Sequence, residues 1–223
     1  MKKTLLSWSS GKDSAWALHV LRQAGDLDLR GLFTVINQKY QRVSMHAVRL
    51  ELLQLQAEAA GLPLRVIEIP YPCSDEQYRA IMHTFVSEAV AAGTECMAFG
   101  DLYLPEVRAY RESRLQGTGI EPVFPLWELP TQGLAVQMLS AGMEAYLSCV
   151  DPSKLPAGLS GRQWSRELIA ELPEGVDPCG ENGEFHTVVV GGPMFSRRIP
   201  VTIGETVERE GFVFTDVIPQ APQ

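Results

Sequence analysis

Cysteine, basic charge and long apolar runs are all scarce in this chain of 223 residues. The four cysteines, Cys73, Cys96, Cys149 and Cys179, form no Cys-x-x-Cys pair, so a zinc cluster is not predicted. Their wide spacing gives no support to a disulfide framework. We therefore expect four reduced thiols, of which Cys179 lies beside the densest polar motif of the chain.

Basic residues are outnumbered by acidic ones, 19 to 27, and the formal net charge is −8. Nucleic acids are attracted mainly by an excess of Lys and Arg, so an extended nucleic-acid partner is not expected. No apolar run approaches the roughly 20 residues of a membrane-spanning helix. Lys2 and Lys3 precede only a short apolar stretch that Ser7 interrupts, unlike a signal peptide. A cytoplasmic protein without a membrane partner is predicted.

Apolar runs rich in branched residues alternate with amphipathic runs through the first 130 residues. The pattern predicts strands over 3–8, 29–37, 64–69 and 97–99, and helices over 13–23, 43–60 and 75–92. Alternation at this spacing is typical of right-handed crossovers, which build a mostly parallel sheet with helices on both faces. The fold class predicted is α/β.

The composition changes at residues 121–133, "EPVFPLWELPTQG", where three prolines and a tryptophan predict a linker. Beyond it, helices are predicted over 134–141 and 163–171, and strands over 145–150, 186–190 and about 199–214. We therefore expect two domains, an α/β domain over 1–130 and a smaller α+β domain over 131–223.

The stretch "SSGKDS", residues 9–14, lies between the first predicted strand and the first predicted helix. Open α/β sheets bind ligands at this end of a strand. Small residues let the backbone approach a phosphate, and the helix N-terminus presents N–H groups to an anion. The candidate nucleotide-binding residues are Ser9, Ser10, Gly11, Lys12, Asp13 and Ser14.

This loop does not match the GxxxxGK[ST] pattern of P-loop ATPases. That pattern requires Gly where the chain has Leu6, and Ser or Thr where it has Asp13. An aspartate inside a triphosphate cradle would repel the ligand unless Mg²⁺ lay between them. Asp13 is therefore a candidate Mg²⁺ ligand, and Lys12 a candidate for stabilising phosphate charge.

The pattern Ser-x-Gly-Lys-Asp-Ser resembles the SGGxDS signature of PP-loop ATP pyrophosphatases, which cleave ATP between the α and β phosphates. Two further stretches, "FGDLYLPEVRAYRESRLQGTGIEPVFPLW" (99–127) and "DPCGENGEFHTVVVGGPMF" (177–195), resemble the diphthine–ammonia ligase family. The resemblance runs in order over nearly the whole chain. It implies a HUP-type (Rossmann-like) ATP-binding domain followed by a smaller domain that helps to form the substrate site.

One motif departs from that family. Diphthine ligases carry a Glu-Gly-Gly-Glu-x-Glu type motif, whereas this chain has "ENGEFHT" over residues 181–187. The variant resembles a bacterial branch suspected of acting on a different carboxylate, with corrinoid metabolism as one suggestion. The resemblance therefore implies adenylation of a carboxylate while leaving the identity of that carboxylate open.

The residues of this motif have chemistry of their own. Gly180 and Gly183 permit a sharp turn that brings Glu181 near Glu184. If a strand begins at Glu184, its side chain and that of His186 share a face. Glu181, Glu184 and His186 could orient ammonia or act as a general base on it, and Glu184 and His186 are the candidate catalytic residues. Ligation of Mg²⁺ by the acidic and histidine side chains, and a structural turn with solvated carboxylates, remain alternatives. The candidate substrate contacts here are Glu181, Asn182 and Glu184.

Further candidates for substrate contact follow the strand at 97–99. Asp101 lies at the same sheet edge as the loop and either binds Mg²⁺ or an amine, or caps the next turn. Arg108, Arg111 and Arg114 line one side of a predicted helix with Tyr110 nearby. They either neutralise an anionic substrate or form a solvated face paired with Glu106 and Glu112.

Two expectations concern the adenine. In the resembling families it lies against the end of the second strand, here Thr34–Asn37, partly through backbone groups. His46, near the start of a predicted helix, either faces the adenine or is a half-buried structural histidine.

The predicted reaction begins with ATP and Mg²⁺ on Ser9–Ser14 and attack by a substrate carboxylate on the α-phosphorus. Lys12 and the helix dipole would stabilise the departing pyrophosphate. Ammonia near Glu184 and His186 would then form the amide. No glutaminase domain is recognised, so free ammonia or a partner would supply nitrogen. The acid is either a small molecule or protein-borne, and a homo-oligomer is compatible with the sequence.

Two other functions compete with this prediction. Some PP-loop enzymes thiolate RNA, but that chemistry favours paired reactive thiols and a basic surface. A non-catalytic ATP sensor would use the same fold, but it has no need for the second polar cluster at 181–187.

Overall fold

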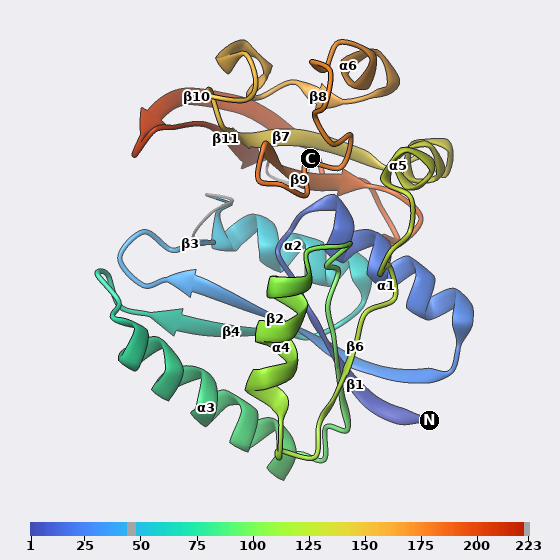
Figure 1. Cartoon of the computed structure of the whole chain (residues 1–223), viewed down its shortest axis with the longest axis vertical. Coiled ribbons are helices and arrows are strands. Elements are labelled where there is room, and N and C mark those ends of the chain that lie inside the picture. Colours follow the sequence, from blue (N-terminus) through green and yellow to red (C-terminus); the bar gives the residue numbers. More distant parts are fainter. Residues whose placement is uncertain (44–47, 221–223) are drawn as a thin grey trace.

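The computed structural model describes residues 1–43 and 48–220. Two sheets follow one another along the long axis of the molecule, the first from the amino-terminal half and the second from the carboxyl-terminal half (Figure 1). His46, a candidate for the adenine site, lies outside the described residues.

The first sheet is parallel apart from one short strand. Its parallel strands are β4 (Leu64–Ile69), β2 (Leu27–Asn37), β1 (Lys2–Ser7), β5 (Cys96–Ala98) and β6 (Glu121–Val123), in that spatial order. The strand β3 (Arg42–Val43) pairs antiparallel with the end of β2. Leu6 of the central β1 lies opposite Leu32 on one side and Ala98 on the other. The predicted α/β fold class is confirmed.

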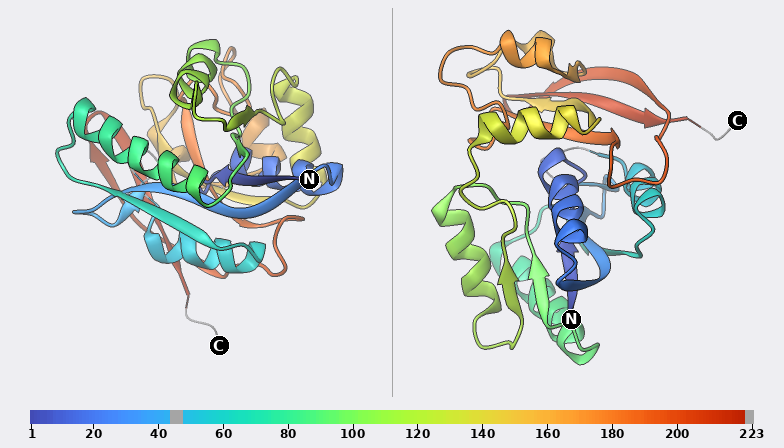
Figure 2. Two further views of the ribbon diagram at one scale, coloured as in Figure 1. Left: turned by 90° about the horizontal axis from the view of Figure 1, so that it is seen from below. Right: turned by 90° about the vertical axis from the view of Figure 1, so that its right-hand side faces the viewer.

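Helices cover both faces of this sheet (Figure 2). One face packs against α1 (Lys12–Ala24) and α2 (Leu50–Ala60), and its apolar core includes Leu6, Leu18 and Leu52. The other packs against α3 (Asp75–Ala91) and α4 (Pro105–Leu115), over a separate cluster that includes Phe33 and Met97. This arrangement follows from the two apolar sides that a parallel strand must bury.

The second sheet is antiparallel and is built around β7 (Glu144–Val150). Its other strands are β8 (Gln163–Trp164), β9 (Phe185–Gly191), β10 (Val201–Arg209) and β11 (Phe212–Pro219). The helices α5 (Thr131–Ser140) and α6 (Arg166–Ala170) and a short 3-10 helix, Ala157–Leu159, complete this half. The expected smaller α+β region is confirmed, whereas the domain boundary at residue 130 stays a prediction.

A partly buried ion-pair cluster ties the two halves together. Asp216 on β11 accepts hydrogen bonds from Arg42 at 2.9 Å and from Arg49 at 3.0 Å. Burial disfavours the charged carboxylate, but the two guanidinium groups outweigh it and lower the pKa of Asp216 to about 2. The contact links the second sheet to the region around the end of β2.

Three sequence predictions of secondary structure were wrong in part. The helix predicted over 43–60 begins only at Leu50, because Val43 pairs with Ile36 in the sheet. The helix predicted over 163–171 begins at Arg166. Trp164 belongs to the strand β8 instead, where it is fully buried and pairs with Ala145 of β7. The predicted linker over 121–133 begins with the strand β6. Pro122 is tolerated there because β6 is an edge strand.

The four cysteines are unpaired thiols, three of them buried, as predicted. Across residues 1–43 and 48–220, no helix combines the length and the apolar character that crossing a membrane requires.

Candidate active site at the edge of the parallel sheet

A cavity of about 240 Å³ lies at the carboxyl ends of β1 and β5. From these neighbouring parallel strands the chain leaves toward α1 on one face and α4 on the other, which is where open α/β sheets bind ligands. Three stretches line the cavity, within residues 7–14, 99–111 and 179–187. The structure thus brings the two predicted polar motifs to one place.

The loop at residues 9–14 forms a compact turn at the start of α1. Ser9 Oγ lies 3.1 Å from Ser14 Oγ and accepts a hydrogen bond from the N–H of Gly11 at 3.3 Å. Ser14 Oγ also donates to the carbonyl of Gly11 at 3.0 Å. The first-turn N–H groups of Asp13 and Ser14 have no intrahelical acceptor, as at any helix start, and are suited to binding an anion.

The second half of the chain holds the backbone of this loop. The carbonyl of Ser10 accepts from the N–H of Val189 on β9 at 3.0 Å. The N–H of Lys12 donates to Thr187 Oγ1, also on β9, at 3.1 Å. Ser10 itself has φ 74°, in the left-handed region that favours glycine. The loop is therefore kept in a strained shape by contacts far away in sequence.

Gln56 on α2 reinforces the same contact. Its side chain is fully buried and donates from Nε2 to the carbonyls of Ser10, at 3.1 Å, and Val189, at 2.7 Å. Its Oε1 accepts from Trp8 Nε1 at 2.8 Å. One side chain thus joins the end of β1, the loop and β9.

Gly100 allows the loop after β5 to lie against the start of α1. A Cβ added at this position would fall 2.8 Å from the carbonyl carbon of Asp13 and 2.9 Å from the backbone nitrogen of Ser14. Both neighbours are backbone atoms, which cannot move aside as a side chain can. Glycine at position 100 therefore allows the loop after β5 to lie directly against the start of α1 in the cavity wall.

Lys12 is buried in the wall between the two halves. Its Nζ lies 2.8 Å from Asp13 Oδ2, donates to the carbonyl of Cys179, and faces the rings of Trp164 and Phe185 at 5.9 and 5.6 Å. Burial works against the ammonium, but the neighbouring Asp13 outweighs it and raises the pKa of Lys12. Lys12 therefore stays protonated and brings a fixed positive charge to the cavity.

Asp13 has one carboxylate oxygen that is still available. Oδ2 pairs with Lys12, whereas Oδ1 is buried and has no hydrogen-bond partner among the described residues. Burial raises the pKa of Asp13, against the attraction of Lys12. In the described ranges, no group of three or more His, Cys, Asp or Glu side chains is arranged to hold a metal ion. A metal here would have Asp13 as one protein ligand and would need others from water or from the nucleotide.

Glu181 projects into the cavity wall from the turn before β9. Its Oε1 accepts from the N–H of Leu102 at 2.8 Å, and burial raises the pKa of Glu181 to about 7. A carboxyl with a pKa near neutrality exchanges a proton readily under ordinary conditions, which suits a general acid or base. The sequence predicted a substrate contact for this residue and left a general base and a Mg²⁺ ligand as alternatives.

Glu184 lies behind the turn rather than among the residues that line the cavity. It is 4% exposed, and Oε1 accepts from the N–H of Asp177 at 3.2 Å and from Asn182 Nδ2 at 3.1 Å. Gly180 and Gly183 have φ of 68° and 77°, as the predicted sharp turn requires. These contacts give Glu184 and Asn182 a place in holding the turn. Their contact with substrate, and the catalytic role of Glu184, stay predictions.

His186 lines the cavity from β9. Burial and the positive charge of Lys12 lower the pKa of His186 to about 4, so the imidazole is neutral near pH 7. A neutral imidazole offers one acceptor and one donor nitrogen. His186 therefore presents a neutral imidazole to the cavity.

Asp101 and Arg111 stand together on the opposite wall. Arg111 Nε donates to Asp101 Oδ2 at 3.4 Å, and both residues line the cavity. The guanidinium of Arg111 lies over the ring of Phe99 at 5.1 Å. This packing fixes a positive group at the mouth of the site, as the anion-binding hypothesis requires.

The remaining predicted contacts of α4 lie outside the cavity. Arg108 pairs with Glu112 at 2.8 Å and packs on the rings of Phe124 and Trp127. Tyr110 is 39% exposed and lines a neighbouring groove. For Arg108 the contacts match the alternative of a paired helix face.

Thr34 and Asn37 are also separate from the cavity. Thr34 is buried within β2, and Asn37 Oδ1 accepts from the N–H groups of Lys39 and Tyr40 at 2.9 and 3.3 Å. Asn37 lines a different cavity, of about 610 Å³, bounded also by residues of β10 and β11. The expected adenine contacts at the end of β2 stay a prediction.

Two residues at the site were missed from the sequence. Thr187 stands inside the recognised motif, but nothing in its type signals a bond to Lys12. Gln56 has a clearer signal, because it is a polar residue at the inward positions of α2 otherwise filled by Leu52, Leu53 and Ala57. An isolated amide on an apolar helix face needs buried partners, and this criterion would have found it.

Two protein-family models match this chain. They are described as "Diphthamide synthase N-terminal domain", over residues 1–121, and "Diphthamide synthase C-terminal domain", over residues 131–217. A diphthine–ammonia ligase of Homo sapiens is 27% identical, with 94% of this chain and 86% of the relative covered. Those of Danio rerio and Rattus norvegicus are 27% and 25% identical, with 94% and 80% of this chain and 90% and 70% of the relatives covered.

Proposed function

The chain belongs to the diphthamide synthase family, and on that premise we propose that it is an ATP-dependent ligase that joins ammonia to a carboxylate. The relatives named diphthine–ammonia ligase support an ATP-dependent amide ligase. The observation that carries the proposal is the single cavity shared by the loop at 9–14 and the motif at 179–187. A phosphate site and an acid–base site within one cavity are what adenylation followed by ammonia transfer requires.

The loop Ser9–Ser14 would receive the pyrophosphate part of ATP against the N-terminus of α1. The partnerless oxygen of Asp13 fits Mg²⁺, which usually takes one or two protein carboxylates and completes its shell with phosphate and water. Bound Mg²⁺ would neutralise phosphate charge. Lys12 would hold Asp13 in place and contribute its own positive charge from the wall.

Arg111 would orient the carboxylate of the substrate, with Asp101 holding the guanidinium. Glu181, whose pKa is about 7, would take the proton that must leave an ammonium ion before its nitrogen attacks. His186 would accept a hydrogen bond from the incoming ammonia. Glu184 and Asn182 would position the turn that carries Glu181.

The identity of the acid stays open in this proposal. The "ENGEFHT" motif departs from the motif of the diphthine ligases, so an acid other than diphthine is an equal candidate. RNA thiolation is disfavoured, because burial raises the pKa of both Cys149 and Cys179 to about 12 and keeps these thiols unreactive.

The test is to incubate the protein with ATP, Mg²⁺, ammonium and a panel of carboxylic acids, and to identify the released nucleotide. AMP and pyrophosphate appearing only with one class of acid would support the ligase. ADP and phosphate would overturn the PP-loop assignment. Tight ATP binding without turnover for any acid would favour a sensor.

A further inference from the structure

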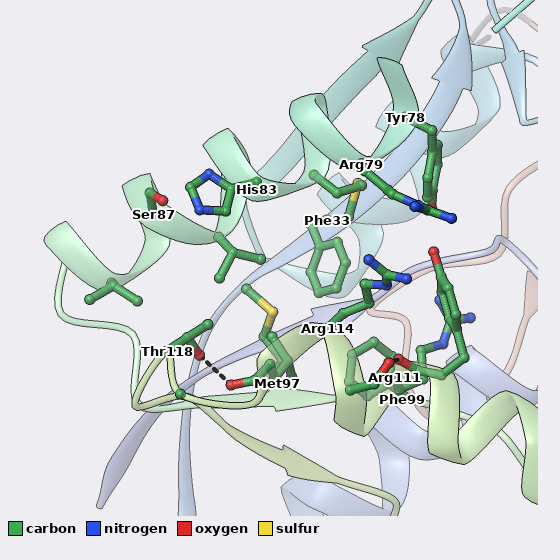
Figure 3. A pocket seen from close by; sticks show the side chains of 17 residues that line it. Phe33, Tyr78, Arg79, His83, Ser87, Met97, Phe99, Arg111, Arg114 and Thr118 are labelled. Atoms are coloured by element: carbon green, nitrogen blue, oxygen red, sulfur yellow. Dashed lines mark hydrogen bonds between the residues drawn. The ribbon is translucent and has the colours of Figure 1, made fainter. Parts of the chain in front are cut away.

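Another cavity, a groove of about 470 Å³, lies between α3 and α4 (Figure 3) and shares lining residues with the candidate active site. Its floor is formed by the apolar side chains of Phe33, Met97 and Phe99 from the face of the parallel sheet. Tyr78 from α3 and Tyr110 from α4 lie on its two sides. The groove therefore offers flat, apolar surfaces below and at the flanks.

The charges around this floor have one sign. Arg79 comes from α3, and Arg111 and Arg114 come from α4, as Figure 3 shows. Among the described residues that line the groove there is no Asp or Glu. This contrasts with the chain as a whole, whose net charge is −8. A basic, carboxylate-free lining in an acidic protein favours an anion over a cation.

The arginines are held by aromatic rings. Arg114 lies over Tyr110 at 5.0 Å, and Arg111 lies over Phe99 at 5.1 Å. Stacking orients a planar guanidinium whose edge can donate to a carboxylate or phosphate. Arg111 already donates from Nε to Asp101 at 3.4 Å, so Arg79 and Arg114 are the cations that a ligand charge would meet in the groove. Glu112 on α4 is paired with Arg108.

The groove and the candidate active site meet at two residues, because Phe99 and Arg111 line both cavities. We propose that the α3–α4 groove binds a small organic anion with a flat apolar body, which packs on Phe33 and Phe99 while Arg79 and Arg114 hold its charge. This assignment does not require ligase activity. If the proposed function holds, the occupant is the body of the acid whose carboxylate is activated in the neighbouring cavity.

The direct test uses three probes of one shape: 2-naphthoate, neutral 2-naphthamide and the cation 2-naphthyltrimethylammonium. Methyl-labelled methionine reports the location, since Met82 and Met97 line the groove whereas Met138, Met143 and Met194 are buried elsewhere. We expect 2-naphthoate to shift Met82 and Met97 saturably, and the cation to leave them unchanged. Equal binding of all three probes, or shifts confined to the other methionines, would overturn the proposal.

Charge reversal gives a second readout. Arg114→Glu is expected to weaken 2-naphthoate binding about tenfold, and the exposed Arg79→Gln by a smaller factor. The matched control is Arg30→Glu, which makes the same change of charge on β2, where Arg30 pairs with Asp28. An equal loss with Arg30→Glu would mean that net charge alone attracts the probe, and would overturn the proposal.

Competition with ATP distinguishes the groove from the proposed nucleotide site. We expect ATP to leave bound 2-naphthoate in place, since the phosphate loop lines only the neighbouring cavity. Displacement of 2-naphthoate by ATP, with the same methionine shifts, would make the groove part of the nucleotide site and overturn the proposal. Binding of 2-naphthoate without AMP release for any acid would leave the groove supported and would count only against the ligase.

Discussion

The two polar segments of the candidate site are held in different ways. The loop at 9–14 has a sequence typical of phosphate binding, yet the shape of its backbone depends on partners outside it, Val189, Thr187 and Gln56. The segment at 177–187 combines bonds to other segments, such as that of Glu181 Oε1 with the N–H of Leu102, with bonds between its own residues. Asp177 Oδ1 accepts from the N–H of Cys179 at 2.6 Å, and Glu184 Oε1 accepts from the N–H of Asp177.

This difference shows that a recognisable motif need not be a self-supporting one. The strained backbone at Ser10 persists because β9 and α2 fix the carbonyl of that residue. The second sheet therefore shapes the loop at 9–14. If this loop binds ATP as proposed, damage to either side of the contact should weaken ATP binding.

The largest effect is expected from Gly100→Val. Its side chain would enter the space held by the backbone of Asp13 and Ser14, and would push the loop away from the cavity. We expect ATP affinity to fall by about a hundredfold or more, since two or more charge-assisted contacts would be lost. Titration calorimetry with ATP measures this directly.

The control for that variant is Gly133→Val in α5, where an added Cβ would meet no atom within 4 Å. It should bind ATP as the unmodified protein does. If Gly100→Val also bound ATP normally, the close approach of the two loops would not matter for the nucleotide site.

Gln56→Leu should have the next largest effect. It would leave the carbonyls of Ser10 and Val189 and the indole N–H of Trp8 with fewer buried partners. Each buried polar group left unsatisfied costs about 1–3 kcal/mol, so we expect a lower free energy of unfolding together with weaker ATP binding. Urea unfolding and ATP titration measure the two effects.

Gln54→Leu on the exposed face of α2 is the matched control and should change neither quantity. An unfolding free energy for Gln56→Leu equal to that of the control would show that the loop does not depend on α2.

Glu181→Gln sharpens the comparison from the side of the segment at 177–187. A base with a pKa near 7 works in its ionised form, so the rate of amide formation should rise with pH through about 7. The variant should lose that rise while binding ATP normally. An unchanged pH profile would remove Glu181 from the proposed proton transfer.

The same residue predicts a change in stability. Because burial raises the folded-state pKa of Glu181 above its ordinary 4.5, the folded state holds the proton more tightly than the unfolded state. The free energy of unfolding should therefore fall as pH rises from about 4.5, the ordinary pKa of the side chain, to about 7, its pKa in the folded state. Glu181→Gln should reduce that fall, and a denaturation series across this range measures it.

The smallest effect is expected from Ser10→Gly. Glycine adopts positive φ without strain, and the Ser10 hydroxyl is buried without a partner among the described residues. We expect a change in unfolding free energy within about 1 kcal/mol, in the stabilising direction. Ser10→Ala removes the same hydroxyl but keeps the strained backbone, so it should be less stable than Ser10→Gly in thermal unfolding. The reverse order would argue against strain in the loop.

The sequence was most informative where the signal is local. Strand–helix alternation predicted the parallel sheet, and the spacing of Gly180 and Gly183 predicted the turn. It failed where tertiary pairing overrides local preference, as at Trp164, which is buried in a strand although its surroundings favour a helix. Contacts between distant segments, such as Thr187 with Lys12, leave no periodic trace and emerge only when the two sheets are placed together.

Removing the hydrogen bond between Lys12 and Thr187 is the most direct test of whether the second sheet shapes the loop at 9–14. Thr187→Val keeps the side-chain shape but removes the hydroxyl that accepts from the N–H of Lys12. Thr215→Val is the control, since Thr215 is equally buried in the second sheet and its hydroxyl bonds to Ser160 and Thr206, which also belong to the second half of the chain. We predict that Thr187→Val raises the ATP dissociation constant about tenfold while Thr215→Val leaves it unchanged. Equal ATP affinity for the two variants would contradict the account.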